Sequence, residues 1–256
     1  MKNKLSINDY NFLKENGYLV LNNFFENNFF VDLLDYCENI LKICKDNNEI
    51  GFKNIRNMKK NDTYDTMSIS NECIFVDRRK NSIDNGMIDI FNPEHCENIR
   101  KKDENPISLF KEIINTKIVS QINKFEQKKL FSLKNTNIYE HIKTSKPRVA
   151  HFDNLKTYYK VFLFLSDVKT SHGSFYYYPG SQKNKFRNKL MSFINHKIFQ
   201  KKNGSDTDIN FLYSFNSNKR DLIGTKGTIV ISDVSGLHGS NPVVNIQRKV
   251  LVQCIR

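Results

Sequence analysis

The sequence contains no long apolar run. Within its 256 residues, no stretch of apolar side chains approaches the length of about 20 residues that a helix needs to cross a bilayer. The first residues, MKNKLSINDYNFLKENG, are polar and lack both the apolar core and the small-residue cleavage site of a signal peptide. We therefore expect no membrane span and no secretory leader, and a cytoplasmic location is the simplest expectation.

Cysteine is scarce and shows no pairing pattern. The five cysteines are an odd number and form no CxxC pair. This argues against a disulfide framework and against a zinc site built from thiolates. Cys37 and Cys44 lie two helical turns apart, so we expect them on the buried face of a helix.

The sequence also lacks internal repeats, low-complexity linkers and nucleophile motifs. The segment HGSN at 238–241 does not form a nucleophile elbow, and no Ser-His-Asp or Cys-His order stands out. A chain of this length can bury one sizeable core. We expect residues 1–256 to form a single catalytic domain.

Acidic residues are outnumbered by basic ones. The 40 Lys and Arg against 27 Asp and Glu give a formal charge of +13. The basic residues are dispersed rather than gathered into one motif, and no nucleic-acid-binding signature accompanies them. A nucleic-acid partner is therefore not expected. The charge gives weak support for an anionic substrate, and a general richness in Lys and Asn is the alternative explanation.

Residues 1–133 are predicted to form mainly helical or lid elements. Helical spacing predicts helices at 7–16, 26–45 and 107–126, and an aromatic run predicts a strand within 17–25. Residues 46–105 are polar and irregular, which favours loops around the mouth of a site.

From about residue 134 the pattern changes to short strands separated by turns. Six such segments, ending with RKVLVQCI, predict a sandwich or barrel of the jelly-roll or cupin kind over residues 134–256. The fold class is thus mainly β with flanking helices. The basic segment 183–226 is expected to be partly helical and to cover the mouth of the barrel.

Two histidines and one aspartate form a candidate metal site. His151 and Asp153 lie two residues apart in AHFDN, so in a strand they would share one face. His238 follows in GLHGS. Two imidazoles and one carboxylate can bind one face of Fe(II) and leave the other face open, although zinc competes for the same ligands.

Arg248 is a candidate anchor for an acidic co-substrate. In the last strand it alternates with Val250, Val252 and Cys254, so an inward apolar face would place a guanidinium inside the barrel. A buried guanidinium needs an anion, and its planar fork suits a carboxylate. An internal Asp or Glu is the alternative partner. Together with the metal ligands, the pattern indicates an Fe(II)-dependent oxygenase that uses 2-oxoglutarate.

Two segments carry a family resemblance. HFDNLKTYYKVFLFLSDVKTSHGSFYYYPGSQK and GTIVISDVSGLHGSNPVVNIQRKVLVQ resemble the phytanoyl-CoA dioxygenase-like family of Fe(II)/2-oxoglutarate oxygenases, from roughly Ile138 to the C-terminus. The resemblance implies a double-stranded β-helix core and the cofactors Fe(II), 2-oxoglutarate and O2. His172 before the glycine and Gln182 after PGS depart from the family pattern.

Carried over by position, the resemblance assigns roles to individual residues. His151, Asp153 and His238 would be the iron ligands, and Arg248 would bind the distal carboxylate of 2-oxoglutarate. Ser240 would join Arg248, with an ordinary turn serine as the alternative.

Four further residues are weaker candidates. Tyr139 and His141, near the entrance strand, could contact the co-substrate, and a structural role is the alternative. Tyr176 and Tyr178 alternate on one strand face and could line the substrate pocket, although core packing is equally compatible with the pattern.

The resulting hypothesis is hydroxylation of a small metabolite with release of succinate and CO2. Asp153 disfavours halogenation, for which relatives replace this carboxylate by a small residue. A hydroxylase acting on a protein or nucleic acid, and a non-catalytic cupin-like metal-binding module, are the alternatives. The pattern specifies neither the substrate nor the oligomeric state.

Overall fold

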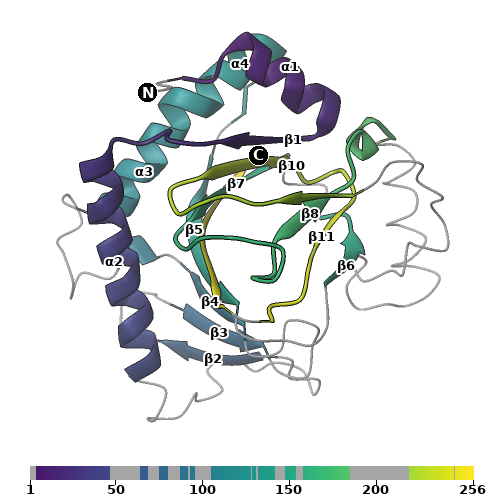
Figure 1. Ribbon diagram of the computed structural model, residues 1–256. Helices are drawn as coiled ribbons and strands as arrows, with labels where there is room; N and C mark the ends of the chain where they lie inside the picture. The colour runs from purple at the N-terminus through teal and green to yellow at the C-terminus, as the bar shows by residue number, and fades with distance from the viewer. Residues whose placement is uncertain are drawn as a thin grey trace.

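Twelve strands form two antiparallel sheets in the computed structural model (Figure 1). The structure describes residues 4–46, 64–68, 75–79, 87–91, 93–95, 105–127, 129–130, 132–141, 148–153, 158–184, 219–244 and 246–256. Most of the segment 183–226, which the sequence predicts to cover the barrel mouth, lies outside these residues.

The larger sheet has eight strands in the order β1-β10-β7-β12-β5-β4-β3-β2. Their bounds are β1 (Tyr18–Leu21), β2 (Tyr64–Ser68), β3 (Phe75–Arg79), β4 (Ile88–Phe91), β5 (Ser132–His141), β7 (Tyr159–Phe164), β10 (Ile229–Asp233) and β12 (Arg248–Ile255).

The smaller sheet has four strands in the order β6-β11-β8-β9. Their bounds are β6 (Arg148–His151), β8 (Phe175–Tyr177), β9 (Arg220–Leu222) and β11 (His238–Ser240). From β5 onward the chain passes between the two sheets at every connection except that from β8 to β9. This crossing pattern is a double-stranded β-helix, or jelly roll, and it confirms the fold class expected from the sequence.

The central strands of the larger sheet carry apolar residues on both faces. On β12, Val250 and Val252 face the barrel interior, where they pack in one cluster with Val230 and Tyr177. Leu251 points to the other face and belongs to the main core beneath the helices. The predicted alternation of β12 is therefore confirmed, and its inner face carries Arg248.

The helices cover the outer face and one edge of the larger sheet (Figure 1). Their bounds are α1 (Ile7–Asn16), α2 (Asn27–Asp46), α3 (Pro106–Ile114) and α4 (Ser120–Glu126), with a π-helical turn, η4 (Asn115–Val119), between the last two. All three helical segments expected from the sequence are confirmed. None of the described helices is long and apolar enough to span a membrane.

Local signals explain where α1 begins and ends. Ser6 caps its first turn in a capping box, accepting from the backbone N–H of Asp9 at 3.2 Å while its own N–H donates to the Asp9 carboxylate at 3.0 Å. Gly17 ends the helix with a φ of 81°, a conformation that favours glycine. A side chain at this position would also clash, because a Cβ there would lie 2.4 Å from the Tyr177 hydroxyl.

The N-terminal half contributes more sheet than the sequence suggested. Strands β2 and β3 form a hairpin, β3 pairs with β4, and β4 pairs with β5 of the jelly roll. The expectation of loops across 46–105 is therefore wrong for these strands. Their polar residues obscure the alternation from which strands are recognised.

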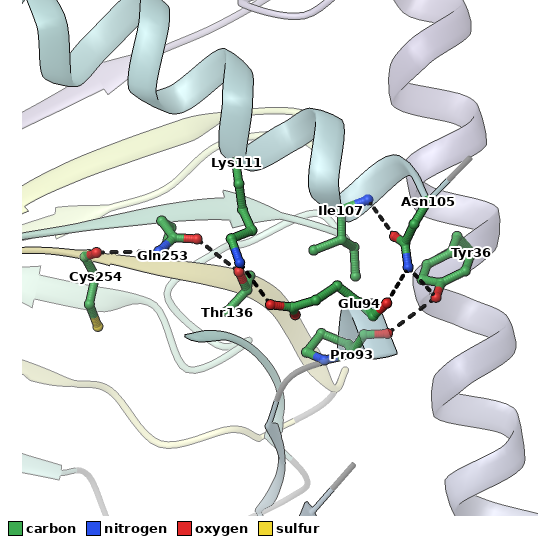
Figure 2. A network of polar contacts seen from close by, with 9 residues as sticks. All are labelled: Tyr36, Pro93, Glu94, Asn105, Ile107, Lys111, Thr136, Gln253 and Cys254. Carbon is green, nitrogen blue, oxygen red and sulfur yellow. Dashed lines mark hydrogen bonds and ion pairs between the residues drawn. The ribbon is translucent and has the colours of Figure 1, made fainter. Parts of the chain in front are cut away.

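A buried polar network ties α2 and α3 to the 3-10 turn η2 (Pro93–His95), as Figure 2 shows. The Asn105 side chain caps α3 by accepting from the Ile107 N–H at 2.9 Å. Its amide donates to the Tyr36 hydroxyl and to the Glu94 carbonyl, each at 2.7 Å. One side chain thus satisfies groups from three separate elements.

We expect Asn105→Ala to lower the free energy of unfolding by about 2–3 kcal/mol. The substitution removes a helix cap and leaves a buried carbonyl without its donor. Urea unfolding followed by circular dichroism measures the loss. Thr116→Ala is the control, because its exposed hydroxyl bonds only within its own helix, and it should change stability by less than about 0.5 kcal/mol. Equal stability of the two variants would contradict the structural role of Asn105.

Candidate metal centre and its cavity

The pairing of β6 with β11 places two histidines opposite each other. His151 ends β6 and is the register partner of His238 at the start of β11. Their ring centroids lie 4.5 Å apart, and both side chains are buried. The pairing of these two strands thus brings together imidazoles that are far apart in sequence.

Asp153 completes the group from just beyond the end of β6. Its Oδ1 lies 3.7 Å from Nε2 of His151 and 3.7 Å from Nε2 of His238. These separations are too long for hydrogen bonds. They are short enough for all three atoms to bind one ion at metal–ligand distances of about 2.1 Å. The three ligand atoms lie within 4.8 Å of one another.

The position of Asp153 differs from the sequence argument. Strand alternation predicts that it shares a face with His151, but Asp153 lies outside the strand, where its backbone N–H donates to the Val234 carbonyl at 3.1 Å. That bond, rather than the two-residue strand period, directs the carboxylate toward the histidines.

Hydrogen bonding and stacking fix the orientation of His238. Its Nδ1 lies 2.9 Å from the Gly236 carbonyl, which can only accept, so Nδ1 carries a proton and Nε2 is the atom that faces Asp153. The Tyr177 ring is nearly parallel to the imidazole, with an interplanar angle of 4°. The Tyr177 hydroxyl donates to the Asp233 carbonyl at 2.8 Å. This tyrosine therefore holds His238 in place from the barrel interior.

Lys160 is the closest charge to the group. On β7, its Nζ lies 2.5 Å from Oδ2 of Asp153. Burial alone raises the pKa of the Asp153 carboxyl, but the attraction of Lys160, followed by that of His238 and His151, outweighs it. The pKa of Asp153 therefore lies well below its usual value, and the carboxylate is ionised at neutral pH.

Arg248 lies inside the barrel, as its strand alternation predicts. It is buried at the start of β12, opposite His141 on β5. Nη1 donates to the Gly173 carbonyl, and Nη2 lies 3.0 Å from Nε2 of His141. A guanidinium can only donate, so His141 accepts through Nε2 and is neutral in this contact. The contact holds the guanidinium in one orientation.

These groups open onto one cavity of about 790 Å³, including the space at its mouth. His151, Asp153 and His238 line it together with Arg248 and Lys160. The remaining lining residues are Met87, Tyr139, His141, Arg148, Phe162, Phe164, Phe175, Val230, Gly239, Ser240 and Val250. The predicted site residues Tyr139, His141 and Ser240 are thus brought into the same cavity as the candidate metal ligands.

Tyr176 and Tyr178 do not line this cavity, which corrects the sequence expectation. Both belong to a cluster on the other side of the smaller sheet, where Tyr176 packs with Phe152 and donates to the Arg148 carbonyl at 3.0 Å. The strand register gives the cavity face to their neighbours instead. Phe175 lines the cavity, and its ring centroid lies 5.1 Å from that of His238.

The two departures from the family pattern have structural roles. His172 is buried, with Nδ1 2.9 Å from the Asp167 carbonyl, and lies outside the cavity. Gln182 donates to the carbonyls of Lys14 and Glu15 at the end of α1.

Sequence reasoning missed Lys160, Arg148 and the cavity phenylalanines. A signal for Lys160 is present, because it interrupts the apolar strand segment YYKVFLFL. Arg148 has no such signal, since its direction depends on an irregularity in strand pairing.

No protein-family model matches the sequence, and a search of curated proteins finds no match. Solved structures match in fold. The non-heme α-ketoglutarate-dependent carbocyclase SnoK from nogalamycin biosynthesis is 14% identical, with a TM-score of 0.59 over 98% of this chain and 83% of that chain.

Two further structural neighbours contain bound ligands. HygX from Streptomyces hygroscopicus, crystallised with nickel, 2-oxoglutarate and hygromycin B, is 12% identical, with a TM-score of 0.56 over 98% of this chain and 87% of that chain. EctD from S. alaskensis, with 2-oxoglutarate and 5-hydroxyectoine, is 14% identical, with a TM-score of 0.58 over 98% of this chain and 76% of that chain. At these identities the likeness establishes the shared jelly-roll fold.

We expect Asp153→Ala to lower the affinity for Ni(II) or Co(II) by more than about 100-fold. Loss of an outer partner of a metal ligand typically costs 10- to 100-fold, and loss of a ligand should cost more. Anaerobic isothermal titration calorimetry measures the affinity. Asp167→Ala is the control, since this exposed carboxylate lies outside the cavity. If both variants bound metal as tightly as the wild type, Asp153 would not be a ligand.

Proposed function

We propose that this protein is an Fe(II)- and 2-oxoglutarate-dependent oxygenase that hydroxylates a small molecule. One observation carries the proposal. Two histidines and one aspartate face a cavity that also contains a buried arginine, Arg248. A metal site and a fixed carboxylate anchor in one cavity match the two requirements of this chemistry.

The residues present fit both groups. Two imidazoles and one ionised carboxylate form the donor set that suits Fe(II), and they line the cavity. In this proposal His151, Asp153 and His238 hold the iron. Arg248 binds the distal carboxylate of 2-oxoglutarate, and Ser240 adds a hydroxyl donor.

When bound, iron and 2-oxoglutarate would supply reduction of O2 coupled to oxidative decarboxylation, giving succinate and CO2 and inserting the second oxygen atom into a substrate C–H bond. The chain itself provides orientation and shielding. Tyr177 and the Gly236 carbonyl hold the His238 ring. His141 orients Arg248, and the apolar wall that includes Phe164 and Val250 limits access of water.

Two features favour a small substrate over the alternatives. The candidate metal ligands and Arg248 line a cavity between the two sheets, where a small molecule can enter whole. A polymer would have to present one side chain or base to it. A non-catalytic metal module needs neither an open metal face nor a buried arginine beside it.

Membership of the phytanoyl-CoA dioxygenase-like family belongs to the same proposal. It is supported by the HxD motif, the distal histidine and Arg248, all of which line the cavity. A cytoplasmic location also remains a proposal. Its support is that Cys37 and Cys254 are free thiols, as is usual in a reducing compartment.

We expect Arg248→Met to weaken 2-oxoglutarate binding roughly 10- to 150-fold. Loss of a charge-assisted pair costs about 1.5–3 kcal/mol, and each 1.4 kcal/mol is a factor of ten. Anaerobic titration of the Fe(II)-loaded protein with 2-oxoglutarate, followed through the visible charge-transfer band, measures the affinity. The matched control is Lys249→Met on the opposite face of β12, where Lys249 contacts Glu38 of α2 at 2.7 Å. An unchanged affinity in Arg248→Met would reject this anchor.

The reaction itself has a separate test. We expect the Fe(II)-loaded protein to form succinate from 2-oxoglutarate in air, slowly alone and faster with a true substrate. Asp153→Ala should form no succinate above the protein-free rate, because it cannot hold iron. Succinate formation by Asp153→Ala at the wild-type rate would contradict the proposed chemistry.

A further inference from the structure

The cavity contains more positive charge than the proposed iron and co-substrate can balance. Among its described lining residues the cations are Arg148, Lys160 and Arg248, and the one acid is Asp153. A divalent ion adds two positive charges and 2-oxoglutarate at neutral pH removes two. Counted over these described lining residues alone, the loaded site holds two more positive charges than negative ones.

The placement of Arg148 depends on an irregularity in the smaller sheet. His238 pairs with His151, and Ser240 pairs with Arg148, so three residue steps on β6 oppose two on β11. In a regular strand, a three-residue separation would put Arg148 and His151 on opposite faces. The register shift instead brings Arg148 to the cavity with Ser240. Bulges of this kind redirect a side chain and are common beside active sites.

Lys160 lies on the facing sheet, beside the candidate metal ligands. Its Nζ forms an ion pair with Oδ2 of Asp153, at 2.5 Å. Its ammonium is partly exposed, with 23% of the side chain accessible, and it lines the cavity. It can therefore hold the carboxylate with one donor and bind a second oxygen acceptor with another.

The cavity lined by the two cations also has an apolar surface. Phe162 on β7 and Phe175 on β8 both line the cavity, with ring centroids 5.1 Å apart. This surface can accommodate the carbon part of a ligand whose charged group is bound by the cations.

We propose that the substrate carries an oxyanion group, such as a carboxylate, sulfate or phosphate, and that Arg148 and Lys160 recognise it. The inference rests on the proposed function, because it concerns the space left after iron and 2-oxoglutarate bind. It assigns Arg148 and Lys160 to substrate specificity and leaves Arg248 to the co-substrate. Binding of the anion neutralises the surplus charge beside the metal, and a neutral ligand leaves it unbalanced.

The test uses small probes and a paramagnetic metal. The protein is loaded with Mn(II) and saturating 2-oxoglutarate, and nuclear relaxation of probe methyl protons is measured. Methylphosphonate and acetate are the anionic probes, and acetamide is the neutral counterpart of acetate. We expect saturable relaxation enhancement for the anions, with an affinity at least about tenfold higher for acetate than for acetamide.

Substitutions of the lining residues test which side chains bind the probes. Arg148→Met and Lys160→Met should each weaken probe binding by about tenfold or more, and Lys160→Arg should restore most of the loss. Lys249→Met, outside the cavity, should bind the probes as the wild type does. Arg148 is not one of the proposed metal ligands, so its variant tests recognition even if Lys160→Met loads less metal.

The outcomes separate this inference from the proposed function. If Mn(II) and 2-oxoglutarate bind but acetamide is enhanced as strongly as acetate, the anion inference alone is overturned. The same follows if Arg148→Met and Lys160→Met bind probes normally, or if the probes displace 2-oxoglutarate, seen as loss of relaxation enhancement of its own methylene protons. If the protein takes up neither Mn(II) nor 2-oxoglutarate, the proposed function falls and this inference with it.

Discussion

The pairing of β6 with β11 is the contact on which the candidate site depends. It sets His151 opposite His238, and the end of β6 then places Asp153 at equal distances from both. Neither strand exceeds four residues, so the pairing cannot persist alone. Its stability comes from β8, which pairs along the other edge of β11. Tyr177 of β8 is the register partner of His238, and its ring is nearly parallel to the imidazole. The geometry of the ligands is therefore a property of the smaller sheet as a whole.

The strands hold the charged side chains of the cavity in fixed positions. Arg248 begins a strand that pairs with β5 at this residue and with β7 from Val250 onward, which fixes the position of its backbone. Lys160 is held close to Asp153 from the neighbouring strand β7. Groups that are fixed before a ligand arrives lose little conformational entropy when it binds. Arg248 and Lys160 are in this sense positioned before a ligand binds.

Much of the fold could be predicted because the pattern and the local signals agree. The helix at 7–16 has a capping residue before it and a glycine after it, and the structure gives the same bounds. The alternation of β12 correctly separated Arg248 from Leu251. The inward direction of Asp153 was also correct, although a backbone bond to Val234, and not strand periodicity, produces it.

The errors arise where long-range pairing decides the direction of a side chain. The direction of Tyr176 depends on which face β8 presents to β11, and the triplet of tyrosines after Phe175 fits either choice. Arg148 reaches the cavity only through a register shift that no local sequence feature marks. Strands β2 to β4 were missed because their polar residues obscure the alternation, and they join the sheet only through successive pairing that begins at β5.

The position of β6 at the edge of its sheet has a consequence for how such a site can change. An edge strand is bonded on one side only, so substitutions and small shifts there disturb few neighbours. Arg148 lies on this strand at its irregular pairing, whereas Arg248 lies on a strand enclosed by two others. Of the two cations proposed to recognise the substrate, Arg148 lies on this edge strand, whereas Lys160 and Arg248 lie on strands that are paired on both sides. Descendants of this scaffold could therefore change substrate recognition by altering β6 while keeping the strands that carry Lys160 and Arg248.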